Sequence, residues 1–131
     1  EAKLKEEKQK YLRLYKKSKR QEELYQSLLN SSADAIVIYN LQGEAEFVSP
    51  SFTKIFGWTL KEVKGTQIPF VPEWERERTL TVIRNLLETG SQVQGFEVQR
   101  YTKDGRLLDI SISASRYNDH EGRPAGMLVV L

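Results

Sequence analysis

The first 30 residues contain neither glycine nor proline, although the whole chain has 8 glycines and 4 prolines. These two residue types most often end or break a helix, so a stretch without them can run as one continuous helix. A helix of this length spans about 45 Å, which is more than one small domain can cover. We therefore expect residues 1–30 to form an amphipathic helical linker, distinct from the rest of the chain.

Apolar side chains recur along this helix at coiled-coil spacing. Placing Leu4, Tyr11 and Tyr25 at the first position of a heptad puts Leu14 and Leu28 at the fourth position. Polar residues interrupt this seam, so the pattern is that of a weak coiled coil. We expect it to pair in a parallel homodimer, and the alternative is a solvated single helix.

The remaining residues, 31–131, show the pattern of one mixed domain. The expected elements are a hairpin over residues 35–48, short helices over 50–57 and 59–65, a longer helix over 73–89, and three strands that begin near residues 96, 106 and 125. The strands are joined by tight turns such as Asp104-Gly105, which favours antiparallel pairing. The fold class is therefore α+β, with a five-stranded antiparallel sheet.

Two of the late strands indicate which face of the sheet is buried. Apolar residues alternate with polar ones from Leu108 to Ala114, so one face of that strand is buried and the other is wet. Phe96, Val98 and Arg100 share one face of the preceding strand. We expect no charged residue to be stranded on the buried face.

The order of elements and four local motifs resemble the PAS family over residues 27–131. The motifs are residues 31–36 before the first strand, 48–52 at the start of the first short helix, 55–58 at its end, and 102–106 at the late hairpin. Each motif alone is weak, whereas the ordered set is specific. The resemblance implies a PAS domain over residues 31–131, with short helices on one face of the sheet and the long N-terminal helix in addition. The C-terminal linker of the family would follow Leu131.

The resemblance also implies a function. PAS domains are non-catalytic input modules that sense or relay signals, so the N-terminal helix would be a signalling helix leading to an output domain in the same protein. By prevalence in the family, the output is a histidine kinase of a two-component system or a cyclic-dinucleotide enzyme. The alternative is a constitutive dimerisation module without a ligand. An enzymatic function is disfavoured because the chain has one histidine and shows no catalytic triad.

PAS domains can hold a ligand in an apolar cavity between helices and sheet. The candidate cavity residues are Phe56, Trp58, Ile68, Phe70, Ile83, Leu87, Ile110 and Ile112. Covalent flavin chemistry of the family requires a cysteine, and the chain has none. Haem in the family is commonly held by a histidine on the long helix, and residues 73–89 contain none. The cofactor is unknown, and we expect a small apolar ligand or none, with no metal site.

The outer face of the sheet is a candidate interface. Val37 and Tyr39 lie opposite Ile36 and Ile38 on the first strand, and we assign them to the outer face. We expect the end of the N-terminal helix to cover this face, or to pair with it in a second subunit. The helix residues concerned are Leu24, Tyr25 and Leu28.

Charge and hydropathy limit the other partners. The net charge is +2, so no overall field selects a nucleic acid or an anionic membrane. The basic stretch 16–20 could contact phosphates, but Glu22 and Glu23 follow it and no base-reading motif accompanies it. No apolar run is long enough to span a bilayer. We expect a cytoplasmic domain without a membrane segment in this fragment, and without nucleic acid as a partner.

Overall fold

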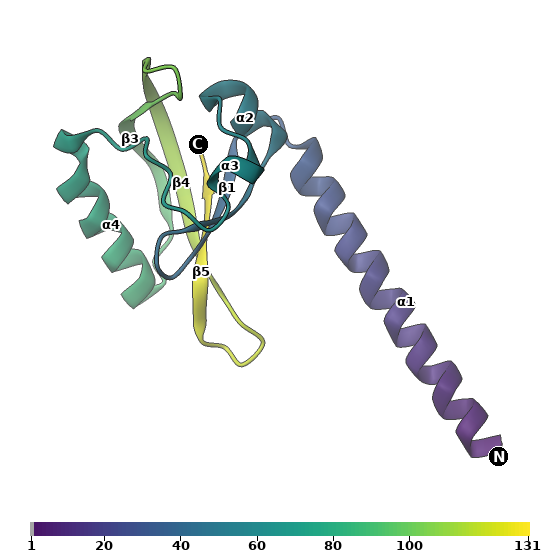
Figure 1. Ribbon diagram of the computed structural model, residues 1–131. Helices are drawn as coiled ribbons and strands as arrows, with labels where there is room; N and C mark the ends of the chain where they lie inside the picture. The colour runs from purple at the N-terminus through teal and green to yellow at the C-terminus, as the bar shows by residue number, and fades with distance from the viewer. Residues whose placement is uncertain (1) are drawn as a thin grey trace. The chain divides into compact units, whose positions relative to one another are not determined.

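Figure 1 shows the computed structural model, which describes residues 2–131 apart from the side chains of Lys3 and Leu4. The chain forms two compact units that meet between Ser31 and Ser32. The first unit is the helix α1 (Ala2–Ser31), which is continuous. The second unit contains β1 (Ile36–Asn40), β2 (Ala45–Val48), α2 (Pro50–Phe56), α3 (Leu60–Val63), the 3-10 helix η1 (Glu73–Glu75), α4 (Arg76–Thr89), β3 (Val93–Tyr101), β4 (Leu107–Asn118) and β5 (Pro124–Val130).

The five strands form one antiparallel sheet in the order β2-β1-β5-β4-β3. The predicted α+β fold, with its sheet, its short helices and the long N-terminal helix, is confirmed. β5 lies between β1 and β4, so the end of the domain holds the two hairpins together (Figure 1). Backbone hydrogen bonds therefore join the first and last thirds of the domain.

The helix starts follow the capping residues that the sequence displays. The Ser49 hydroxyl accepts a hydrogen bond from the Phe52 N–H at 3.3 Å, and Pro50 occupies the first turn of α2. Thr59 and Glu62 form a reciprocal capping box at the start of α3. Gly57 ends α2 in the left-handed conformation with a φ of 98°. The long helix differs from the prediction because its first turn, η1, is a 3-10 helix.

The face assignment of β1 was wrong. Val37 is fully buried and Tyr39 packs with it, and both belong to the face that the helices cover. The opposite face of β1 carries Ile36 and Ile38, which pair with Val130 and Leu128 of β5. All four residues from 36 to 39 are apolar or aromatic, so alternation alone could not tell which pair faces inward.

Two hydrophobic clusters fill the space between helices and sheet. The first is packed by α2, α3 and the segment before η1, and its largest side chains are Phe52, Phe56 and Phe70. The second lies under α4 and includes Leu86 and Met127. Tyr39, Ile110 and Leu131 contact both clusters, so the inner face of the sheet is continuous from one to the other.

Candidate functional site

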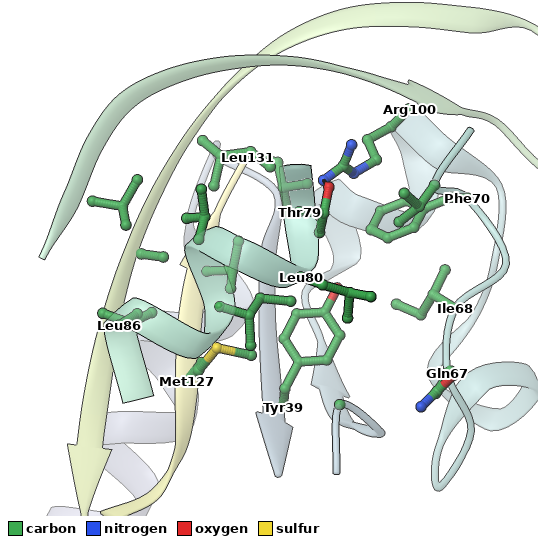
Figure 2. A pocket seen from close by; sticks show the side chains of 18 of the residues that line it. Tyr39, Gln67, Ile68, Phe70, Thr79, Leu80, Leu86, Arg100, Met127 and Leu131 are labelled. Atoms are coloured by element: carbon green, nitrogen blue, oxygen red, sulfur yellow. Dashed lines mark hydrogen bonds between the residues drawn. The ribbon is translucent and has the colours of Figure 1, made fainter. Parts of the chain in front are cut away.

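A cavity of about 520 Å³ lies between α4, the inner face of the sheet and the segment that connects α3 to η1 (Figure 2). Most of its wall is apolar, with Leu86 from α4 and Met127 from β5 at one end. Ile68 and Phe70, from the connecting segment, lie on another side. Its size is in the range typical of small-molecule sites in proteins.

Polar contacts hold α4 at both ends. At its start, the carboxylate of Glu75 accepts a hydrogen bond from the Gln99 N–H of edge strand β3 at 3.3 Å. At its end, the Arg116 guanidinium of β4 donates to the Leu87 carbonyl at 3.0 Å, which satisfies an end carbonyl of the helix. Small side chains, including Ala114 of β4, lie on the sheet beneath. The fold therefore fixes both ends of α4 and leaves space between the middle of this helix and the sheet.

Arg100 places a positive charge in the cavity wall. Its side chain projects from β3, and the residue is only 3% exposed. The guanidinium donates hydrogen bonds to the Thr79 hydroxyl at 3.0 Å and to the Gln99 carbonyl at 2.8 Å. Burial lowers the pKa of Arg100 from its ordinary value, while the neighbouring Tyr39 and Glu75 oppose that shift. The expectation that no charged residue lies on the buried face was wrong.

Tyr39 and Thr79 add neutral polar groups to the same cavity. In Figure 2 the Tyr39 ring stands in the cavity with its hydroxyl directed toward the end where Thr79 and Arg100 lie. Burial raises the pKa of the Tyr39 phenol well above its ordinary value, with Arg100 acting in the opposite direction. The phenol therefore keeps its proton at neutral pH and is a hydrogen-bond donor. The cavity is amphipathic, with Tyr39, Thr79 and Arg100 close together in a wall that is otherwise mostly apolar.

The structure separates the eight predicted cavity residues into two sets. Four of them line the cavity: Ile68, Phe70, Ile83 and Ile112. The other four, Phe56, Trp58, Leu87 and Ile110, lie outside its wall and pack within the two hydrophobic clusters. Phe56 stacks on Phe52 at 4.9 Å between ring centroids, and Trp58 meets Phe70 edge-on. These aromatic rings therefore fill the neighbouring core.

Several cavity residues were missed in the sequence. On α4 the predicted cavity residues were Ile83 and Leu87, whereas Leu86 is the α4 residue that is fully buried. Thr79, Ile83 and Leu86 follow the spacing of one helical face, and this signal was available. Arg100 was visible as an inner-face residue because it alternates with Phe96 and Val98, but its hydrogen-bond partner Thr79 is distant in sequence.

The α1 residues proposed for dimerisation expose large apolar side chains. Exposed fractions are 70% for Tyr11, 53% for Leu14 and 63% for Leu28, and Leu24 and Tyr25 are also exposed. Leu4 lies outside the described side chains. Val37 and Tyr39 belong to the inner core, so they do not form an outer interface. Packing of the helix end on the sheet stays a prediction.

Residues 2–131 lack two features that would point to other functions. No helix in this range is long and apolar enough to cross a membrane. The described side chains also contain no group of three or more histidine, cysteine or acidic residues that could hold a metal ion.

Comparison with known proteins gives the family. The model of the PAS fold matches residues 23–131, which is most of the chain and includes every residue of the cavity wall. The comparison with curated proteins finds no match.

Solved structures show the same architecture. The PAS domain of a protein from Colwellia psychrerythraea is 17% identical, with a TM-score of 0.75, over 82% of this chain and 92% of that one. The PAS domain of an HTR-like protein from Haloarcula marismortui is 22% identical, with a TM-score of 0.69, over 95% and 98%.

A LOV protein from Rhodobacter sphaeroides is 17% identical, with a TM-score of 0.71, and the match covers 86% of this chain but 65% of that one. The likeness to all three structures is one of fold, since their identities are low. The match of the family model over residues 23–131 carries the assignment. The chain belongs to the PAS family, whose domains are signal-sensing modules.

Proposed function

We propose that this domain is the ligand-sensing input module of a larger signalling protein, and that the cavity under α4 is its sensory site. The observation that carries the proposal is the cavity of about 520 Å³ lined by α4 and the inner sheet face. A concave site of this volume, with a mostly apolar wall and a few polar groups, has the usual form of a small-molecule site in proteins.

The signal is a change in how α4 packs on the sheet. A ligand that binds one packing arrangement more tightly than another shifts the population toward the first. Since Glu75 and Arg116 fix the ends of α4, a ligand beneath its middle acts on a helix that is already held in place. In the proposed mechanism this shift changes the pairing of α1 helices in a homodimer and thereby biases an output domain, for which a histidine kinase is the first candidate.

Native mass spectrometry combined with an absorbance scan tests the ligand. We expect the purified chain to retain a small molecule, and we expect Ala114→Leu to lose it because the added side chain fills the cavity. Ser111→Leu is the matched control, since Ser111 is exposed on the opposite face of the same strand. A wild-type chain that carries no bound mass, and binds nothing from a cell extract, would contradict the sensory role.

A second candidate function is dimerisation and relay without a ligand. It is favoured by the exposed side chains of Tyr11, Leu14 and Leu28, which occupy the heptad seam of α1. Sedimentation equilibrium of Leu14→Asp tests the pairing, with Gln9→Asp outside the seam as the control. We expect the wild type and Gln9→Asp to be dimers and Leu14→Asp to dissociate at least tenfold more readily. If all three chains dissociate equally, α1 is not part of the dimer interface.

A further inference from the structure

We propose that the cavity recognises a small amphipathic carboxylate, with its anionic group on Arg100 and its apolar body toward Leu86 and Met127. This inference rests on the proposed sensory function and specifies its ligand class.

The first argument is the charge balance around Arg100. No carboxylate lies within ion-pair distance of its guanidinium among the described residues. Glu75 is the acidic residue whose charge raises the pKa of Arg100, and both of its carboxylate oxygens are already engaged. One oxygen accepts from the Gln99 N–H, and the other pairs with Arg78, each at 3.3 Å. Two guanidinium groups thus share one carboxylate, and an excess positive charge remains beside the cavity.

The second argument is the number of donors that the protein leaves available. A guanidinium carries five N–H groups, and the hydrogen bonds of Arg100 go to Thr79 and to the Gln99 carbonyl within the described part of the chain. The Thr79 hydroxyl accepts from Arg100, so its own proton is still to be donated. The Tyr39 phenol, kept protonated by burial, is directed toward the same end (Figure 2). A planar two-oxygen anion matches such a set of donors.

The third argument selects a carboxylate over a phosphate group. Removing an ion from water is costly, and the cost rises with its charge, so a buried ion should match the charge of its partner. Arg100 is the buried positive charge of the wall, whereas Arg76, which also lines the cavity, is exposed to solvent. Most of the remaining wall is apolar, so a single buried positive charge is to be matched. A carboxylate supplies one negative charge. A doubly charged phosphate would leave one negative charge without a partner in an apolar space.

The volume limits the apolar part of the ligand. At roughly 30 Å³ for each water-sized group, the cavity holds on the order of 17 non-hydrogen atoms. Decanoate is within this limit, and decanol has the same apolar body with a neutral head. The two molecules therefore test the role of charge at nearly constant shape.

Isothermal titration calorimetry of the intact chain with each probe tests the inference. We expect decanoate to bind the wild type at least tenfold more tightly than decanol, because a hydrogen-bonded charge pair contributes a factor of about 10 to 100. Arg100→Met, a neutral side chain of similar length, should abolish this preference. Arg100→Lys keeps the positive charge but lacks the paired N–H donors of a guanidinium. This variant should retain part of the preference for decanoate. Ala114→Leu should weaken the binding of both decanoate and decanol.

The outcomes separate this inference from the sensory function. Equal binding of decanol and decanoate to the wild type, lost in Ala114→Leu, would overturn the carboxylate assignment while leaving the cavity a ligand site. Decanoate binding that neither Arg100→Met nor Ala114→Leu changes would place the molecule elsewhere and also overturn it. No binding of either probe would overturn it as well, and the bound mass in native mass spectrometry would then judge the sensory function separately. The comparison of head groups uses the wild type alone, so it does not depend on the folding of a variant.

Discussion

On the β1–β2 side of the sheet, the rings of Phe52 and Phe56 stack at 4.9 Å between centroids, whereas on the β3–β4 side α4 stands over a cavity of about 520 Å³. Both regions belong to the same layer of helices and cover the same face of the same sheet. The packed half holds the fold together through large buried aromatic side chains that pack against one another. The cavity half is less tightly packed, and its wall includes the buried charge of Arg100.

The largest difference should appear when a ring is removed from the packed half. Phe52→Ala deletes a fully buried ring that also meets Phe70 edge-on, so we expect a loss of about 3–5 kcal/mol in the free energy of unfolding. Arg84→Ala, on the exposed side of α4, is the control and should change it by less than about 0.5 kcal/mol. Urea unfolding monitored by circular dichroism measures both. A loss for Phe52→Ala as small as that of the control would show that the packed half does not depend on this ring.

A matched pair of enlarging substitutions sharpens the comparison. Ala45→Leu adds volume to the packed half, where Ala45 is fully buried, and should cost about 1–3 kcal/mol. Ala114→Leu adds the same volume beside the cavity, so it should cost less than about 1 kcal/mol. The same urea titration compares the two variants. A larger loss for Ala114→Leu would mean that the space under α4 cannot take up a side chain.

The smallest expected effect concerns a surface contact of the packed half and depends on pH. Hydrogen bonds from Lys103 and then from Thr59 lower the pKa of Glu62 from 4.5 to about 2. Because the pKa is lower in the folded chain, the Glu62 carboxylate stabilises the fold at pH values above about 4.5. That contribution is lost as the pH falls from 4.5 toward 2. It is small because the groups are exposed.

Glu62→Gln tests this contribution. The urea midpoint of the variant should lie below that of the wild type at pH 7, and the two midpoints should converge as the pH approaches 2. Glu46→Gln, which changes an exposed carboxylate on β2, is the matched control. If the difference in urea midpoint between Glu62→Gln and the wild type stays constant between pH 7 and pH 2.5, the substitution acts through helix capping and not through the charge of Glu62.

Much of the fold could be predicted because its signals are local. Ser49 and Thr59 cap α2 and α3, Gly57 and Gly90 end α2 and α4 in the left-handed conformation, and such residues are visible at the bounds expected for these helices. The alternation from Leu108 to Ala114 gave the inner face of β4 correctly, since polar residues occupy the other face. Local capping residues and the alternation of apolar and polar residues were therefore sufficient to predict the order of helices and strands along the chain.

The cavity was harder to predict because it depends on contacts between distant residues. β1 is apolar on both faces, so the sequence could not tell that Tyr39 points inward. The 3-10 turn before α4 and the bond from Arg100 to Thr79 likewise depend on how β3 and α4 meet. A buried charge can be recognised in a sequence by its place in an alternating strand, but its hydrogen-bond partner on another element cannot.

Methyl-detected NMR during a titration with decanoate tests the contrast between the two halves most directly. The account predicts that methyl signals around the cavity, such as those of Ile83, Leu86 and Met127, shift with added decanoate. The methyl signals of Val48 and Val63 in the packed half should stay in place. Shifts of equal size in both halves, or none under α4 at saturating decanoate, would contradict it.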